Sequence, residues 1–159
     1  MPGDLPTNTA LPPRLQLEIR SEAAQIAPIR HQIEDFARQA QFDEAAVGQI
    51  GLCVNEALAN VIRHAYDGAA GRPIVVTAEC RLDENGPAHS HGKQICVTIR
   101  DWGKGNNPAD CAPKCKDPLR PGGLGMICLR EWMDQVTFVP QPDGMLLILV
   151  KNQHRCLKT

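Results

Sequence analysis

The chain has 159 residues and a mass of 17.4 kDa, which is the size of one domain and too small for two independent ones. Its 17 Lys and Arg nearly balance its 18 Asp and Glu, so the formal charge of −1 offers no general attraction for nucleic acid or anionic lipid. Aromatic residues are only 4% of the chain, and platforms for stacking RNA bases are therefore scarce. We predict an aliphatic core and no direct nucleic-acid partner.

The sequence contains no run that approaches the roughly 18 apolar residues of a membrane span. Its first residues also lack the apolar stretch of a signal peptide. We therefore expect a cytoplasmic protein without a membrane partner. The seven cysteines are irregularly spaced, and most are expected to be reduced thiols.

The chain begins with a predicted tail, a strand and a helix. Residues 1–13 contain four prolines and are expected to form a flexible tail. Apolar and polar residues alternate from Leu15 to Arg20, which is typical of a half-buried strand. Ser21 is the expected N-cap of a helix that ends near Ala40. Pro28 predicts a kink in this helix or a later start.

A second helix and a hairpin follow. The helix is expected to begin after the N-cap Asp43, because apolar residues keep helical spacing as far as Tyr66. Residues 74–82 and 94–100 read as adjacent strands, with residues 83–93 as a polar loop between them. We predict that these two strands form an antiparallel hairpin.

The last third of the chain predicts a lid, a helix and two strands. Residues 106–121 hold four prolines and show no periodicity, which favours a functional lid over a simple turn. Residues 124–133 are expected to form a helix, and residues 135–139 and 145–150 two strands. This element order predicts an α+β, two-layer sandwich in which about three helices cover one face of a mixed, mostly antiparallel sheet of about five strands. The single domain would span residues 14–152, with 153–159 as a C-terminal tail.

The first polar cluster lies in the second helix. Glu56, Asn60 and His64 are spaced at i, i+4 and i+8, so they share one helix face. The amide oxygen of an asparagine is a suitable ligand for Mg²⁺, and a carboxylate can take a proton from a nucleophile. A solvated helix face is the alternative interpretation of the same spacing.

The second cluster directly follows the strand that ends at Arg100. Asp101 at a strand end can accept a hydrogen bond from an exocyclic amine such as that of adenine. Gly103 and Gly105 would let the following backbone approach a ligand closely. A plain Asp/Gly turn is the alternative.

The third cluster is the glycine-rich segment from Pro121 to Met126, which leads into a helix. Free N–H groups and the dipole at the start of a helix suit phosphate oxygens. An ordinary helix entry is the alternative.

In this order, with a lid between the second and third, the clusters resemble the N, G1 and G2 boxes of the Bergerat ATP-binding fold shared by gyrases and histidine kinases. The resemblance covers Leu15 to Lys151 and is closest to the small anti-sigma-factor serine kinases of bacterial partner-switching systems. A histidine kinase would carry a phospho-accepting histidine, but the residues after His31 lack the expected acidic and proline pattern.

The resemblance implies that Glu56 is the general base, that Asn60 binds Mg²⁺ and that Asp101 reads adenine. The segments that it places against the nucleotide are Gly103 and Gly105 on the adenine side, and Gly123, Leu124 and Gly125 on the phosphate side. ATP and Mg²⁺ are the implied cofactors.

The two predicted loops carry further charged and metal-binding residue types. The cations that would close on the γ-phosphate are Lys114, Lys116 and Arg120. A solvated loop is the alternative for these three. The four residues that would form a Cys₂His₂ zinc site are His89, His91, Cys111 and Cys115. Exposed thiols and imidazoles are the alternative for these four.

The resemblance implies an ATP- and Mg²⁺-dependent protein-serine/threonine kinase that acts as an anti-sigma factor. It would hold a sigma factor or another regulator inactive and phosphorylate a small anti-anti-sigma protein of the STAS type, and the family also implies a homodimer. One alternative is a nucleotide-responsive binding module that transfers no phosphate. Another is a fold that binds no nucleotide, because residues 144–147 carry no hydroxyl where the family often has a threonine.

Overall fold

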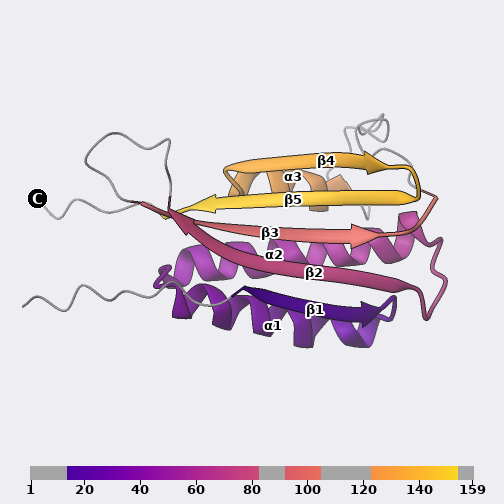
Figure 1. Ribbon diagram of the computed structural model, residues 1–159, viewed down its shortest axis with the longest axis horizontal. Coiled ribbons are helices and arrows are strands. Elements are labelled where there is room, and N and C mark those ends of the chain that lie inside the picture. Colours follow the sequence, from indigo (N-terminus) through magenta and orange to yellow (C-terminus); the bar gives the residue numbers. More distant parts are fainter. Residues whose placement is uncertain (1–13, 83–91, 105–122, 154–159) are drawn as a thin grey trace, which may run out of the picture.

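Three helices and five strands make up the part of the chain that the computed structural model describes, residues 14–82, 92–104 and 123–153. The elements are β1 (Leu15–Arg20), α1 (Ala23–Gln39), α2 (Glu44–Asn60), the π-helical turn η1 (Val61–Ala65), β2 (Pro73–Leu82), β3 (Lys93–Asp101), α3 (Gly123–Trp132), β4 (Gln135–Gln141) and β5 (Gly144–Asn152) (Figure 1). The predicted order of strands and helices is confirmed.

The five strands form one sheet in the order β1-β2-β3-β5-β4. The predicted hairpin of β2 and β3 is confirmed, and each of the four described strand pairings is antiparallel. The expected mixed sheet is thus corrected to an antiparallel one among the described strands. The pairs β2–β3 and β4–β5 are successive strands that pair directly, which favours antiparallel pairing, and β1–β2 and β3–β5 are antiparallel as well. The helices lie together on one side of the sheet, which confirms the two-layer α+β architecture (Figure 1).

The core lies between the sheet and the helices. Side chains of a strand point alternately to the two faces of the sheet, so every second one points toward the helices. The register places Val76, Ile99 and Leu147 side by side across β2, β3 and β5. These side chains are buried, as are the apolar residues that the helices turn toward them, Ile33, Ile50, Val54, Leu58 and Leu129. The core is mainly aliphatic, as the composition predicted, and its buried aromatic side chains are Phe36, Phe42 and Tyr66.

The start of α1 differs from the prediction. The N-cap is Glu22 rather than Ser21, and the helix begins at Ala23. The Ser21 hydroxyl is buried and donates a hydrogen bond to the Ala69 carbonyl (2.6 Å), while it accepts one from the Arg72 N–H (2.9 Å). Ser21 therefore anchors β1 to the turn before β2, and this tertiary contact replaces the expected cap.

Pro28 neither delays nor ends α1. It is exposed in the second turn of the helix, and the Ala24 carbonyl that its missing N–H leaves without an intrahelical donor belongs to an exposed residue, which water can reach. Asp43 is confirmed as the N-cap of α2, because its carboxylate accepts a hydrogen bond from the Ala46 N–H at 2.7 Å.

The stretch Glu44–Ala65, which is α2 with η1, is the one helix of the described residues that is long and apolar enough by composition to cross a membrane. Its apolar side, however, is buried in the core against the sheet and α1. A helix at the centre of a folded domain passes the same test of length and composition. The stretch therefore gives only weak support for a membrane span.

Four cysteines lie among the described residues, and all four are free thiols, as expected. Cys53 of α2 is fully buried, and its thiol donates to the Cys128 carbonyl of α3 at 3.7 Å. Burial raises the pKa of Cys53 to about 12, so this thiol stays protonated at neutral pH. Cys53 is a packing residue between the two helices.

Candidate functional site

Side chains from the end of α2 meet the first turn of α3. Glu56 and Asn60 are half-buried and lie one helical turn apart. A Cβ added to Gly125 of α3 would lie only 2.7 Å from the Glu56 Oε2 and 3.5 Å from the Asn60 Nδ2. An alanine there would require the Glu56 carboxylate to shift, so three residues predicted from two separate motifs lie together.

The Asn60 amide is already oriented by a neighbouring side chain. Its Oδ1 accepts a hydrogen bond from the Arg63 guanidinium at 3.3 Å. This bond is long and its donor is exposed, so water or a cation can replace the guanidinium at low cost. The Asn60 oxygen therefore remains available as a ligand.

His64 does not continue the predicted row. The backbone changes from α-helical to π-helical directly after Asn60, and the wider turn η1 ends the i, i+4 spacing. His64 is exposed within η1. The polar face of α2 that can contact a ligand is therefore limited to Glu56 and Asn60.

Asp101, the last residue of β3, is the one buried carboxylate among the residues that the structure describes, with 3% of its surface exposed. Its Oδ1 accepts a hydrogen bond from the Gly103 N–H at 2.9 Å. Burial raises the pKa of Asp101, although the Gly103 N–H, the charge of Arg100 and the Met145 N–H oppose this effect. Within the part of the chain that the structure describes, Asp101 has no ion-pair partner, and a buried acceptor of this kind can be satisfied by a ligand donor.

The turn after Asp101 packs on the end of η1. A Cβ at Gly103 would overlap the Ala65 carbonyl, and the Lys104 N–H donates to that same carbonyl at 3.3 Å. The Tyr66 hydroxyl accepts a hydrogen bond from the Trp102 N–H at 2.8 Å. These contacts join the segment that carries Asp101 to the helix that carries Glu56 and Asn60.

Gly144 closes the same end of the sheet from β5. Its φ of +156° lies in a region that favours glycine, and a Cβ there would overlap the Asp101 carbonyl. The next residue, Met145, pairs with Asp101 in the sheet and is buried. At this position, where the family often has a threonine hydroxyl, the chain has the backbone N–H and the apolar side chain of Met145.

Several predicted residues cannot be placed. Gly123 and Leu124 belong to the first turn of α3, but their surroundings are outside the description, and Gly105 lies in an undescribed segment. The lid cations and proposed zinc ligands that also lie outside it are Lys114, Lys116, Arg120, His89, His91, Cys111 and Cys115. Within residues 14–82, 92–104 and 123–153, no group of three or more His, Cys, Asp or Glu could hold a metal ion.

Sequence reasoning treated Tyr66 only as the end of a helix. The structure shows it buried, with 8% of its surface exposed and its hydroxyl bonded on two sides. The available signal was that the only tyrosine of the chain directly follows the helix with the polar cluster. Its partners are distant in sequence, and the pattern alone does not show them.

The chain belongs to the family of histidine kinase-like ATPase domains, whose profile matches residues 19–151. This match confirms the family to which the three clusters pointed. A comparison with curated proteins found no match.

Among solved structures, the fold resembles a crystal structure of the RsbU and RsbW domains of Rv1364c from Mycobacterium tuberculosis, with a TM-score of 0.56 and 15% identity. That match covers 89% of this chain and 33% of the other, so this chain spans about a third of the length of that relative. The histidine kinase domain of the Erythrobacter litoralis EL346 blue-light activated histidine kinase also matches, with a TM-score of 0.47, 19% identity, and coverage of 82% of this chain and 60% of the other.

Proposed function

We propose that this chain is an ATP- and Mg²⁺-dependent protein-serine/threonine kinase that acts as an anti-sigma factor and phosphorylates a small STAS-type anti-anti-sigma protein. Membership of the histidine kinase-like ATPase family supports ATP binding by a kinase-like domain. The observation that carries the finer proposal is the meeting of Glu56 and Asn60 at Gly125, because a carboxylate that can accept a proton and an amide that can bind Mg²⁺ lie one helical turn apart.

Asp101 fits the adenine side of this site. Its buried carboxylate is an acceptor, and the exocyclic amine of adenine is a donor. The Gly103 and Met145 N–H groups oppose the effect of burial and favour the ionised form that can accept this bond. Gly103 and Gly105 would carry the backbone past the base.

Asn60 and the start of α3 fit the phosphate side. Asn60 would offer its Oδ1 to Mg²⁺ after the Arg63 guanidinium has moved away. Gly123, Leu124 and Gly125 lie in the first turn of α3, where backbone N–H groups have no acceptor within the helix and would bind phosphate oxygens. When bound, Mg²⁺ would neutralise charge that develops on the transferred phosphoryl group.

Glu56 would be the general base. An acceptor hydroxyl loses a proton as it attacks phosphorus, and a carboxylate within hydrogen-bond reach can take that proton. Among the described residues, no cation is paired with the Glu56 carboxylate. Its half-buried position beside Gly125 leaves the proton-accepting oxygen next to the proposed phosphate side.

The identity of the partner rests on resemblance. The ordered motifs resemble those of anti-sigma kinases, and the chain shares its fold with a protein whose solved domains include RsbW. We therefore propose a STAS-type protein as the phosphate acceptor, a sigma factor or another regulator as the sequestered partner, and a homodimer as the active form in the cytoplasm.

The test is phosphoryl transfer from γ-labelled ATP to a STAS-type protein encoded by the same genome, with Mg²⁺ present. The proposal predicts an acid-stable phosphate on serine or threonine, and no transfer by the Asp101→Asn variant. An acid-labile phosphate would identify a histidine acceptor and contradict the proposal. Stable binding of the partner without any transfer would instead support the nucleotide-responsive binding module.

A further inference from the structure

A buried hydroxyl joins the two halves of the candidate site. Tyr66 follows η1 directly, and its hydroxyl donates to the Pro73 carbonyl at 2.5 Å and accepts from the Trp102 N–H at 2.8 Å. The directions are fixed, because a carbonyl can only accept and a backbone N–H can only donate. Replacing this hydroxyl would leave the Trp102 N–H and the Pro73 carbonyl without this partner.

The bond to Trp102 controls the backbone that holds Asp101. Trp102 lies between Asp101 and Gly103, and the Gly103 N–H donates to the Asp101 Oδ1 at 2.9 Å. Fixing the Trp102 N–H therefore limits the direction in which the Gly103 N–H can point. The carboxylate orientation depends on a short segment that Tyr66 holds on one side.

Ala65 holds the other side of the same segment. Its carbonyl accepts the Lys104 N–H at 3.3 Å and lies so close to Gly103 that a Cβ would overlap it. Ala65 and Tyr66 are consecutive, so the end of the Asn60 helix fixes two points of the turn after Asp101. If either of these two contacts is lost, the turn can change position, and the Asp101 carboxylate moves with it.

The orientation of a carboxylate decides which purine it accepts. Adenine presents a donor amine at C6, whereas guanine presents an acceptor carbonyl there. Guanine has its donors at N1 and N2, so a carboxylate that shifts or rotates can accept from them instead. Discrimination between ATP and GTP therefore requires a carboxylate that is held in place as well as charged.

We propose that Tyr66 is a positioning residue for base recognition, whose hydroxyl holds the Asp101 carboxylate in the orientation that prefers ATP over GTP. The inference rests on the proposed role of Asp101 in reading adenine. Tyr66 touches no substrate in this mechanism and acts through Trp102 and Gly103.

The test compares the dissociation constants of ATP and GTP, measured by calorimetry, for the wild type and Tyr66→Phe. The variant keeps the ring in the core and removes only the hydroxyl. We expect the preference for ATP to fall about threefold or more, the effect of one weakened hydrogen bond. Thr77→Val is the matched control, because it removes another buried hydroxyl, bonded to Thr98 in the middle of the sheet.

A structural role alone would lower the melting temperature and leave the ATP-to-GTP ratio unchanged at temperatures well below unfolding. Replacement of tyrosine by 3-fluorotyrosine gives a second variant that changes only position 66, since the chain has one tyrosine. The more acidic hydroxyl is a weaker acceptor for the Trp102 N–H, so the ratio should shift in the same direction by less.

An unchanged ratio in both Tyr66 variants, or an equal change in Thr77→Val, overturns the inference while the adenine site itself stands. A wild type that binds ATP and GTP equally well, or binds neither, contradicts the adenine role of Asp101 and overturns both. The two failures are therefore distinguishable in one set of titrations.

Discussion

On each of two sides of α2, a glutamate packs against a glycine of a neighbouring helix, but we assign the two glutamates different roles. On one side, Glu34 of α1 lies over Gly51 of α2, where a Cβ would overlap its carboxylate. On the other side, Glu56 of α2 lies over Gly125 of α3, where a Cβ would lie 2.7 Å from its Oε2. In both places a glycine lets a glutamate carboxylate settle against the backbone of a neighbouring helix.

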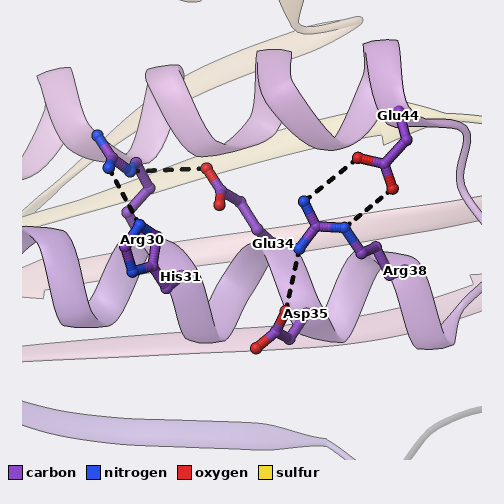
Figure 2. Close-up of polar contacts among 6 residues, drawn as sticks. All are labelled: Arg30, His31, Glu34, Asp35, Arg38 and Glu44. Carbon is purple, nitrogen blue, oxygen red and sulfur yellow. Dashed lines mark hydrogen bonds and ion pairs between the residues drawn. The ribbon is translucent and has the colours of Figure 1, made fainter.

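The two carboxylates differ in what neutralises them. The Arg30 Nε lies 3.6 Å from the Glu34 Oε1, and the same guanidinium contacts His31 (Figure 2). It also donates a hydrogen bond to the Asn55 side chain of α2 at 3.4 Å. Glu34 is thus part of a polar network between α1 and α2. No ion pair engages Glu56 within the part of the chain that the structure describes. The two glutamates pack in the same way, so packing does not distinguish them. The difference is the neighbouring cation, which is present beside Glu34 and absent beside Glu56 among the described residues.

The largest expected effect separates the two glutamates. Glu56→Gln keeps the shape of the side chain but cannot take a proton, so phosphoryl transfer should fall by about 10²- to 10⁴-fold while ATP still binds. Glu34→Gln is the matched control and should leave transfer unchanged. Transfer of labelled phosphate and calorimetric titration with ATP measure the two properties. Equal transfer by wild type and Glu56→Gln would contradict the role of Glu56 as base.

The two glycines should respond differently to the same methyl group. Gly51→Ala forces the Glu34 side chain from its place and should cost about 1–3 kcal/mol, less up to about 1 kcal/mol that alanine returns through helix propensity. Gly125→Ala displaces the Glu56 carboxylate. It should lower the rate of phosphoryl transfer markedly and change the free energy of unfolding only slightly.

Urea unfolding and transfer assays on both alanine variants measure the difference. A loss of transfer in Gly51→Ala equal to that in Gly125→Ala would show that the two sides of α2 are not functionally distinct.

Asp101 should show the cost of a buried charge through the pH dependence of stability. Burial raises its folded pKa above the unfolded value of about 3.9, so the folded state binds the proton more tightly. Its ionisation lowers stability as pH rises from the unfolded pKa through the raised folded pKa. Asp101→Asn should therefore gain stability relative to wild type at pH 7, and the gain should shrink on acidification to about pH 3. A variant that is less stable at pH 7 and regains parity in acid would reverse this sign.

The smallest effect is expected at Arg38, which joins the end of α1 to the start of α2. Arg38 contacts Asp35 at 3.0 Å and Glu44 at 2.9 Å, but 44% of its side chain is exposed (Figure 2). Solvent and salt screen such pairs. Arg38→Ala should therefore leave the urea midpoint nearly unchanged at physiological salt, whereas a loss as large as that of Gly51→Ala would mean that this pair supports the helix interface.

The sequence predicted the features that depend on local pattern. Alternation located β1, and apolar runs on either side of a polar loop located β2 and β3. Asp43 was identified as a helix cap because its partner, Ala46, is three residues away. The ordered motifs also brought Glu56, Asn60 and Gly125 into one site before any geometry was known.

Features with distant partners were missed. Ser21 has the chemistry of a cap, but its partners Ala69 and Arg72 are 48 and 51 residues away, and they outcompeted the helix end. The hydroxyl of Tyr66 bonds Trp102, 36 residues away. The contact of Glu34 with Gly51 likewise exists only once two helices pack, so periodicity within either helix carries no sign of it.

The most direct test of the central claim, that Asp101 and the Glu56–Asn60 helix form one ATP site, is calorimetric titration of the wild type and Asp101→Asn with ATP, with and without Mg²⁺. The account predicts micromolar binding by the wild type that strengthens with Mg²⁺ and is lost in the variant. Absence of binding by the wild type, or equal binding by Asp101→Asn, would contradict it.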